Sequence, residues 1–322
     1  MKRLVPQLSV FLAASLLALS APAQNFPSKQ IRLIVPFPAG GPSDVLARVT
    51  GEKLAINWGQ QVLVDNRPGA NTIIGAELVA KAPPDGYTLL LAIDSTLTMN
   101  QYLYSKLPYD PLRDFAPVTQ MMTGAMIMVA DSAMGPKSIQ ELVQLAKANP
   151  GKISYGGGTI ISQLGGELFK RVAGIDMVYV PYKGSTPTTQ GLLSNDVTFI
   201  FNGVTSDLPH IRSGKFRLLA NTGSRGIPAI PDAPRLMDVP GFAGFDVAVW
   251  LGLVAPAGTP PEILNRIHQE IARVYTLQDV KDKLAGAGIE PVTSTPAEFA
   301  AFIRRDAERW SKVIRDAGIK LD

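Results

Sequence analysis

Two glycine-rich segments carry residues that could bind an anion through the backbone. The first runs from Pro36 to Asp44, with helical character from Val45, and the second runs from Tyr155 to Gln163 and enters a helix. Glycine allows the backbone to approach a ligand closely, and the start of a helix presents unpaired N–H groups with a partial positive charge. A carboxylate or another oxyanion is therefore the expected occupant of such a segment.

Either segment alone could be a plain strand-to-helix turn. Both, however, follow short apolar runs, and in doubly wound sheets ligands lie beyond the carboxyl ends of the strands. The two segments stand at corresponding points of two similar stretches of the chain. We therefore expect them to hold a small acid from both sides of a cleft.

The sequence lacks the common motifs of catalysis and cofactor binding. Gly156 and Gly158 are two of the three glycines of a dinucleotide fingerprint, but Ile161 stands where the third is required. No phosphate-binding GxxxxGK[ST] segment, no GxSxG nucleophile turn and no cysteine occurs, and neither His210 nor His268 has metal-ligand spacing. We expect no catalytic residue, no metal and no cofactor.

The alternative to a protein that only binds a small acid is a hydrolytic enzyme on a two-lobed α/β scaffold. Its best general acid–base pair would be Asp44 with Asp94.

Apolar strands that alternate with helices predict two similar α/β units. The first has strands at 31–36, 61–64 and 87–93 and a helix at 71–81; the second has strands at 152–155, 177–180, 198–201 and 217–221 and helices at 162–172 and 185–193. Near-continuous apolar strands between helices are typical of a parallel sheet covered on both faces.

Two further apolar strands, at 125–130 and 247–255, lie outside these units and are expected to join them. The predicted fold is α/β, with two doubly wound lobes joined by crossing strands. Residues 24–123 and 247–322 would form lobe 1, and residues 124–246 would form lobe 2.

The N-terminus has the pattern of a secretory signal peptide over residues 1–23. Lys2 and Arg3 precede a mostly apolar run at 4–19, and Ala21-Pro22-Ala23 offers small residues for cleavage near Ala23. This pattern predicts a periplasmic protein. It also argues against an effector-sensing domain of a transcription regulator, which would need a helix-turn-helix and a cytoplasmic location.

The charge distribution suits a small anionic ligand and no nucleic acid. The formal net charge is +4, and removal of Lys2 and Arg3 leaves 4 − 2 = +2. The basic residues are scattered rather than gathered into a patch, so a nucleic-acid footprint is not indicated. We expect a monomer.

The chain resembles the Bug (TctC-like) family of periplasmic substrate-binding proteins of tripartite tricarboxylate transporters. The resemblance rests on stretches that occur in order along the mature chain: IRLIVPFPAGGPSDVLAR at 31–48, VDNRPGA at 64–70, PPDGYTLLLA at 83–92, MVYVPYKG at 177–184, SDLPHIRSGKFRLLA at 206–220, WLGLVAPAGTPPEI at 250–263 and TPAEFAAFIRRD at 295–306.

The resemblance implies a type II periplasmic-binding-protein fold whose hinged lobes close on one ligand, with the membrane subunits of a tripartite tricarboxylate-type transporter as partners. By resemblance, the ligand would contact a first loop, a second loop and additional cleft residues. These are Phe37, Pro38, Ala39, Gly40, Gly41, Ser43 and Asp44; Gly158, Thr159, Ile160, Ile161, Ser162 and Gln163; and Asp94, Ser95, Thr96, Lys183 and Asn202.

Several positions depart from the family pattern and bear on the ligand. Gln163 stands where many relatives carry histidine, and Ile160 and Ile161 make the second loop apolar. These residues favour a carboxylate with an aromatic or otherwise apolar body over a small polyanion. Asp94 either caps the helix after it or points inward, and the second case would favour an amino acid. A dicarboxylate is a further alternative.

Overall fold

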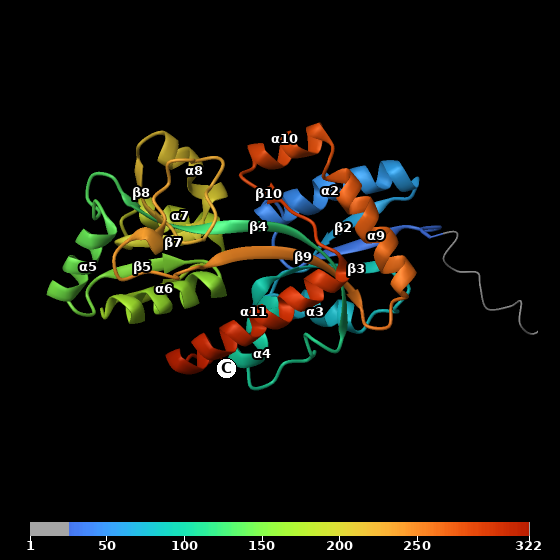
Figure 1. Cartoon of the computed structure of the whole chain (residues 1–322), viewed down its shortest axis with the longest axis horizontal. Helices are drawn as coiled ribbons and strands as arrows, with labels where there is room; N and C mark the ends of the chain where they lie inside the picture. The colour runs from blue at the N-terminus through green and yellow to red at the C-terminus, as the bar shows by residue number, and fades with distance from the viewer. Residues whose placement is uncertain (1–25, 322) are drawn as a thin grey trace, which may run out of the picture.

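A computed structural model describes residues 26–321, and the predicted signal peptide lies outside these residues. Two units of strands and helices lie at opposite ends of an elongated molecule, and two long strands run between them (Figure 1). Within the described residues, no helix is long and apolar enough to cross a membrane.

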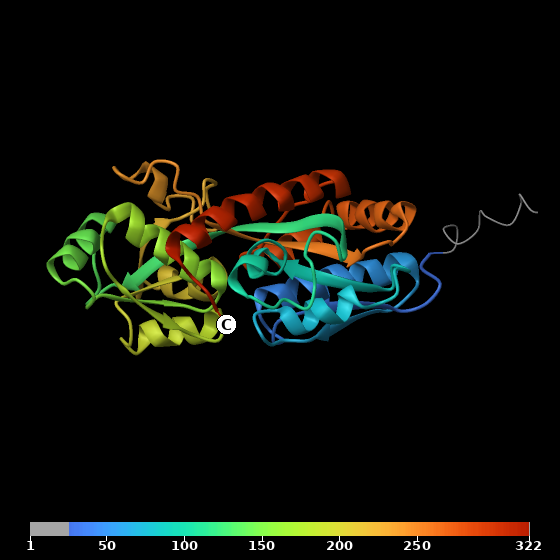
Figure 2. The same ribbon diagram turned by 90° about the horizontal axis from the view of Figure 1, so that it is seen from below.

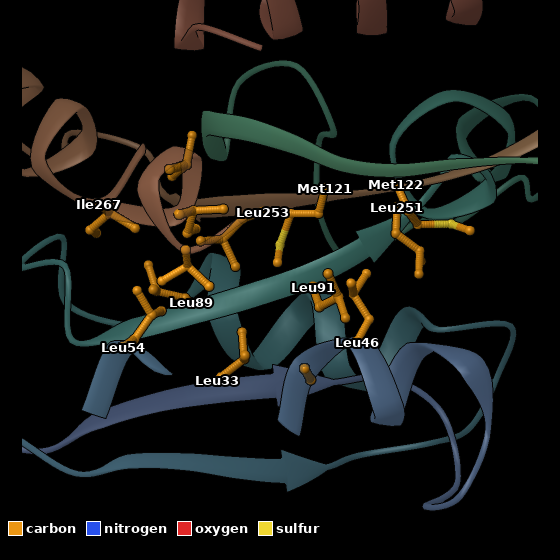
Figure 3. Close-up of a cluster of buried hydrophobic side chains, with 14 of the residues drawn as sticks. Leu33, Leu46, Leu54, Leu89, Leu91, Met121, Met122, Leu251, Leu253 and Ile267 are labelled. Carbon is orange, nitrogen blue, oxygen red and sulfur yellow. The ribbon is translucent and has the colours of Figure 1, made fainter. Parts of the chain in front are cut away.

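The first unit is built on three parallel strands, with β1 between β2 and β3. Its elements are β1 (Ile31–Val35), α2 (Pro42–Trp58), β2 (Val62–Asn66), α3 (Ile73–Ala80) and β3 (Thr88–Ile93), followed by the π-helix η2 (Ser95–Met99) and α4 (Asn100–Leu103). Apolar side chains of α2 and these strands meet those of the long strands in a core (Figure 3).

The second unit repeats the arrangement, with β5 parallel to both β6 and β7. Its elements are α5 (Ile139–Ala148), β5 (Ser154–Gly157), α6 (Ile160–Ala173), β6 (Val178–Pro181), α7 (Ser185–Leu193), β7 (Phe199–Gly203), α8 (Val204–Arg212), β8 (Phe216–Asn221) and the short 3-10 helix η3 (Leu236–Asp238). The two predicted α/β units are confirmed, with strand ends shifted by one or two residues.

Two antiparallel strands, β4 (Phe115–Asp131) and β9 (Ala248–Pro256), connect the units. The first part of β4 pairs with β9, and its last residues pair with β7 and β8 of the second unit. The sheet therefore continues from unit to unit in the order β2-β1-β3-β9-β4-β7-β5-β6. The predicted crossing strands are confirmed. The predicted lobe boundaries fall inside β4 and just before β9, and they stay a prediction.

The C-terminal segment consists of α9 (Pro261–Val274), α10 (Gln278–Gly286), β10 (Glu290–Pro291) and α11 (Pro296–Ala317). Helices α9 and α10 pack on α2. Helix α11 lies along both units (Figure 2): Phe299 and Ile303 pack in an apolar cluster of the first unit, and Trp310 and Ile314 pack in that of the second. This helix therefore braces the two units beside the crossing strands.

Candidate ligand-binding site

A cavity of about 400 Å³ lies between the two units, beside β4 and β9. The first unit and the C-terminal segment contribute residues 37–43, Ile93, Gly288 and Glu290, and the long strands contribute residues 122–126 and Val249. The second unit contributes Thr159, Ile161 and residues 183–187, 203–206 and 226–228. Both predicted glycine-rich loops therefore reach one cavity from opposite sides.

The first loop joins β1 to α2 and is held in shape by Asp44. This carboxylate is buried and accepts hydrogen bonds from Gly40 N (2.9 Å), Arg48 Nε (2.8 Å) and Asn66 Nδ2 (3.0 Å). The same Asn66 amide donates to the carbonyl of Phe37 at 3.0 Å. Asp44 does not line the cavity, so its position is that of a support behind the loop.

Burial opposes ionisation of Asp44, but the hydrogen bonds from Arg48, Gly40 and Asn66 and the charge of Arg48 outweigh it. The pKa of Asp44 is therefore held below its usual value. The ionised carboxylate can then anchor the loop throughout the neutral pH range.

The start of α2 is open toward the cavity. Its N-cap residue Gly41 has no side chain to cap the first turn, and Pro42, without an N–H group, occupies the first helical position. A Cβ atom added to Gly41 would meet only Pro38 O, at 3.9 Å. No side chain of Gly41 therefore stands between the backbone and the cavity.

The second loop differs from the first in that a side chain caps the helix that follows it. Thr159 caps α6 by accepting a hydrogen bond from Ser162 N at 3.3 Å, and the two side-chain hydroxyls lie 2.7 Å apart. A Cβ atom at Gly158 would lie 2.3 Å from Gly184 O, so this glycine is required by packing between loops. Of the predicted second-loop residues, Thr159 and Ile161 line the cavity.

Two further helix starts reach the cavity that sequence reasoning missed. Helices α7 and α8 begin after Gly184 and Gly203, and neither N-cap glycine has a side-chain cap. Ser185, Thr186, Thr205 and Ser206 from their first turns also line the cavity. The signal was present, since each segment is a glycine that follows a predicted strand by two to four residues and precedes two hydroxyl residues within the next three positions.

A buried polar network holds α7 and α8 together. Asn202 Nδ2 donates to Asp207 Oδ2 (3.1 Å) and to the carbonyl of Ser185 (3.3 Å), and Thr189 Oγ1 donates to Asp207 Oδ1 (2.5 Å). Burial raises the pKa of Asp207 to about 6, although these hydrogen bonds lower it. Asn202 does not line the cavity, so it supports the two helix starts from behind.

Asp94 lies away from the cavity. Its carboxyl is buried, with Oδ1 accepting a hydrogen bond from Ser95 N at 2.5 Å at the start of η2. Burial raises the pKa of Asp94 to about 8, and the nearby Asp306 carboxylate on α11 raises it further. Of the two interpretations left open by the sequence, the structure matches the helix cap.

The other predicted residues divide between the cavity wall and its support. Lining residues from the predicted set are Phe37, Pro38, Ala39, Gly40, Gly41, Ser43, Thr159, Ile161 and Lys183. Residues of the predicted set outside the lining are Asp44, Asp94, Ser95, Thr96, Gly158, Ile160, Ser162, Gln163 and Asn202. Ile160 is buried in the apolar cluster of the second unit, and Thr96 Oγ1 lies 2.7 Å from Thr72 Oγ1.

The cavity wall is mainly apolar and nearly free of charge. Apolar side chains from both units and the crossing strands line it: Phe37, Pro38, Ile93, Met122, Met126, Ile161, Val204, Ile227, Pro228 and Val249. Among the described lining residues, only Lys183 and Glu290 are charged. An uncapped helix start is thus combined with an apolar surface on each side, which suits an organic anion better than an inorganic one.

A bilobed α/β protein with a ligand cavity between its lobes, reached by helix starts from each side, has the architecture of a solute-binding protein. Residues 46–319 match the family described as the tripartite tricarboxylate transporter family receptor, TctC. The chain belongs to this family, whose members are substrate-binding proteins. The predicted family and fold class are confirmed.

Individual relatives cover nearly all of the chain. The protein BugT of Bordetella pertussis is 34% identical over 324 residues, which is 100% of this chain and 99% of the relative. The solved structure of R. palustris Rpa4515 with adipate is 31% identical, has a TM-score of 0.85, and covers 92% of this chain and 99% of its own. MatC of Rhodopseudomonas palustris with bound malate is 28% identical, with a TM-score of 0.78 and coverages of 90% and 99%.

Proposed function

We propose that this chain is a periplasmic protein that captures a small carboxylate with an apolar body and releases it to a tripartite tricarboxylate-type transporter. One observation carries the proposal: uncapped starts of α2, α7 and α8 converge from both units on one mainly apolar cavity. Free backbone N–H groups at helix starts bind carboxylates, and the apolar wall adds roughly 25 cal/mol for each Å² of ligand surface that it buries.

The hydroxyl residues of the second unit extend this argument. Ser185, Thr186, Thr205 and Ser206 stand in the first turns of α7 and α8, where their side chains add hydrogen-bond partners beside the backbone groups. Such a set accepts a polar or carboxylate end of the ligand. The solved relatives with adipate and malate support carboxylates as the ligand class.

Asp94 gives no support to an amino-acid ligand, because its carboxyl caps η2 and is buried away from the cavity. The hydrolytic alternative loses its acid–base pair for a related reason. Asp44 lies behind the first loop and Asp94 lies beneath α11, so neither carboxyl lines the cavity. Binding without turnover is therefore part of the proposal.

The two units are proposed to close on the ligand by a hinge in the crossing strands β4 and β9. Export by a signal peptide over residues 1–23, with cleavage near Ala23, and action as a monomer complete the proposed function.

Calorimetric titration of the mature protein tests the proposal. The panel holds benzoate, terephthalate, adipate, citrate and glutamate, and each acid is recovered afterwards and checked for chemical change. We expect one site per chain, tighter binding of an apolar-bodied acid than of citrate, and unchanged acid. Tighter binding of citrate than of every apolar-bodied acid would refute the ligand class, and a converted acid would refute binding without turnover.

A further inference from the structure

We infer that Lys183 and Glu290 form an ion pair across the cavity when the two units close, so that Lys183 holds the closed state and does not bind the ligand carboxylate. The inference rests on the proposed function, because it concerns closure on a bound acid. Lys183 and Glu290 are the only charged residues among the described residues that line the cavity. They differ in sign and come from different units.

The backbone beside Lys183 is held by a hydrogen bond, while the Lys183 side chain is exposed and can extend toward the opposite wall of the cavity. Lys183 stands between β6 and α7, and the next residue, Gly184, donates its N–H to Gly158 O at 3.2 Å. The close approach of Gly184 to Gly158 leaves no room for a Cβ atom at Gly158. The Lys183 side chain is exposed, and its flexible stem can place the ammonium group over several ångströms.

Glu290 is held on the opposite wall by β10. Its backbone pairs with Thr123 of β4, and Val292 N donates to Met121 O at 3.1 Å. Two residues earlier, Gly288 faces α8 of the second unit: a Cβ atom added there would lie 3.3 Å from Thr205 Oγ1. The strand that carries Glu290 therefore already adjoins the second unit, and closure of the cleft would narrow the remaining distance.

Both charges lack a partner in the structure as it stands. Within residues 26–321, neither the Lys183 ammonium nor the Glu290 carboxylate takes part in an ion pair or a side-chain hydrogen bond. Two opposite charges in the wall of a cavity that loses water on closure attract one another more strongly than two charges in bulk water. Their mutual neutralisation leaves the backbone N–H groups of the helix starts to bind the ligand anion.

A charge swap separates this pair from direct ligand binding by Lys183. The probe is whichever of benzoate, terephthalate and adipate binds the wild type most tightly. Lys183→Glu and Glu290→Lys should each raise the Kd about fivefold or more, and the double variant should return to within about twofold of the wild type. Lys215→Glu, an exposed reversal in the second unit outside the cavity, serves as the control for net charge.

Zero-length coupling with a carbodiimide reads the contact in the wild-type protein. The reagent joins a lysine amine to a carboxylate only when the two touch, and the Lys29–Asp85 and Lys53–Asp279 ion pairs provide internal positive controls. Because the carbodiimide also activates the ligand acid, the yield is taken relative to the two control pairs. We expect peptide mass spectrometry to find a Lys183–Glu290 isopeptide whose relative yield rises with the bound acid. Absence of this isopeptide while the controls couple would overturn the inference.

A double variant as weak as Lys183→Glu would also overturn it, because it would place Lys183 on the ligand. Failure of the proposed function gives a different result from failure of the ion pair. In that case no acid of the panel binds the wild type, whereas the coupling experiment without ligand still reports whether Lys183 and Glu290 meet.

Discussion

The backbone N–H of Gly40 donates a 2.9 Å hydrogen bond to Asp44 Oδ2, and this bond closes the loop that precedes α2. The Asp44 carboxylate also accepts hydrogen bonds from Arg48 and Asn66. One buried carboxylate therefore connects the loop, helix α2 and the end of β2. The loop residues at the cavity are therefore positioned before any ligand arrives. Such preorganisation reduces the ordering entropy that binding must overcome.

Asp44→Ala should weaken binding of the tightest acid about tenfold although the side chain does not line the cavity. Loss of the carboxylate leaves Gly40 N without its partner and frees the loop, and a donor left unsatisfied costs about 1–3 kcal/mol. Titration calorimetry measures the change. Asp131→Ala is the matched control, because Asp131 caps the N–H groups of Ala133 and Met134 in a turn away from the cavity. Equal affinities of Asp44→Ala and wild type would remove the support role.

Gly41→Val should reduce affinity at least about a hundredfold while the protein stays folded. Gly41 has φ −83°, and a Cβ atom there would make only an ordinary contact with Pro38 O, so the backbone accepts a side chain that then fills the cavity. Gly40 has φ +86°, where valine is strained, which makes Gly41 the cleaner test. Circular dichroism reports the fold, and Gly286→Val in α10 is the control, because a Cβ atom at Gly286 would meet nothing within 4 Å. Retained affinity in a folded Gly41→Val protein would mean that the loop is only a turn.

Asp94→Asn should flatten the dependence of stability on pH. The folded-state pKa of Asp94 is about 8 and the ordinary pKa of an aspartate is 3.8, so between these values the folded protein binds one more proton than the unfolded chain. The contribution of this proton is fully present below pH 3.8 and is lost as pH rises through about 8. The free energy of unfolding of the wild type therefore falls with rising pH in this range, by roughly 1.4 kcal/mol per pH unit at most.

The check is urea unfolding of the wild type and Asp94→Asn from pH 5 to pH 9. The variant should gain stability relative to the wild type as pH rises toward 8. The exposed Asp232→Asn is the control. If both variants follow the wild-type curve at every pH, the buried Asp94 carboxyl does not titrate in this range.

The fold could be predicted from the sequence because its signals are local. Apolar runs such as Ile31–Val35 and Thr88–Ile93 are buried parallel strands, and Thr295 and Ser138, each with a glutamate three residues later, cap α11 and α5. Thr259, with Glu262 three residues later, has the same pattern but does not cap a helix: α9 begins at Pro261, and Thr259 Oγ1 donates to Pro256 O instead. The last residue of β9 thus takes the hydroxyl that would otherwise cap the helix.

The site was predicted less completely, because its geometry depends on tertiary contacts. Gly158 has the residue type of a ligand loop, yet its lack of a side chain serves the contact with Gly184. Asn202 and Asp44 are polar residues beside the cavity whose groups are directed to neighbouring backbone and side chains. Glu290 was missed because a two-residue strand, β10, brings it to the cavity from far along the chain.

Ligand binding should bring the two units together. The cavity has walls on both units and the crossing strands are the only sheet connection between them in the described residues, so closure can occur by a hinge in β4 and β9. Small-angle scattering should show a smaller radius of gyration with saturating acid. Gly41→Val with the same acid should give the unliganded curve, and superimposable wild-type curves would argue against hinge closure.

The central claim is that backbone N–H groups at the helix starts bind the negative charge of a carboxylate. The most direct measurement is a pair of titrations of the wild type, one with the tightest acid of the panel and one with the primary amide of that acid. The two probes share their body and differ in charge. Because charge-assisted hydrogen bonds contribute about 1.5–3 kcal/mol, the acid should bind about tenfold to a hundredfold more tightly than the amide. Equal affinity for the acid and its amide would contradict the claim.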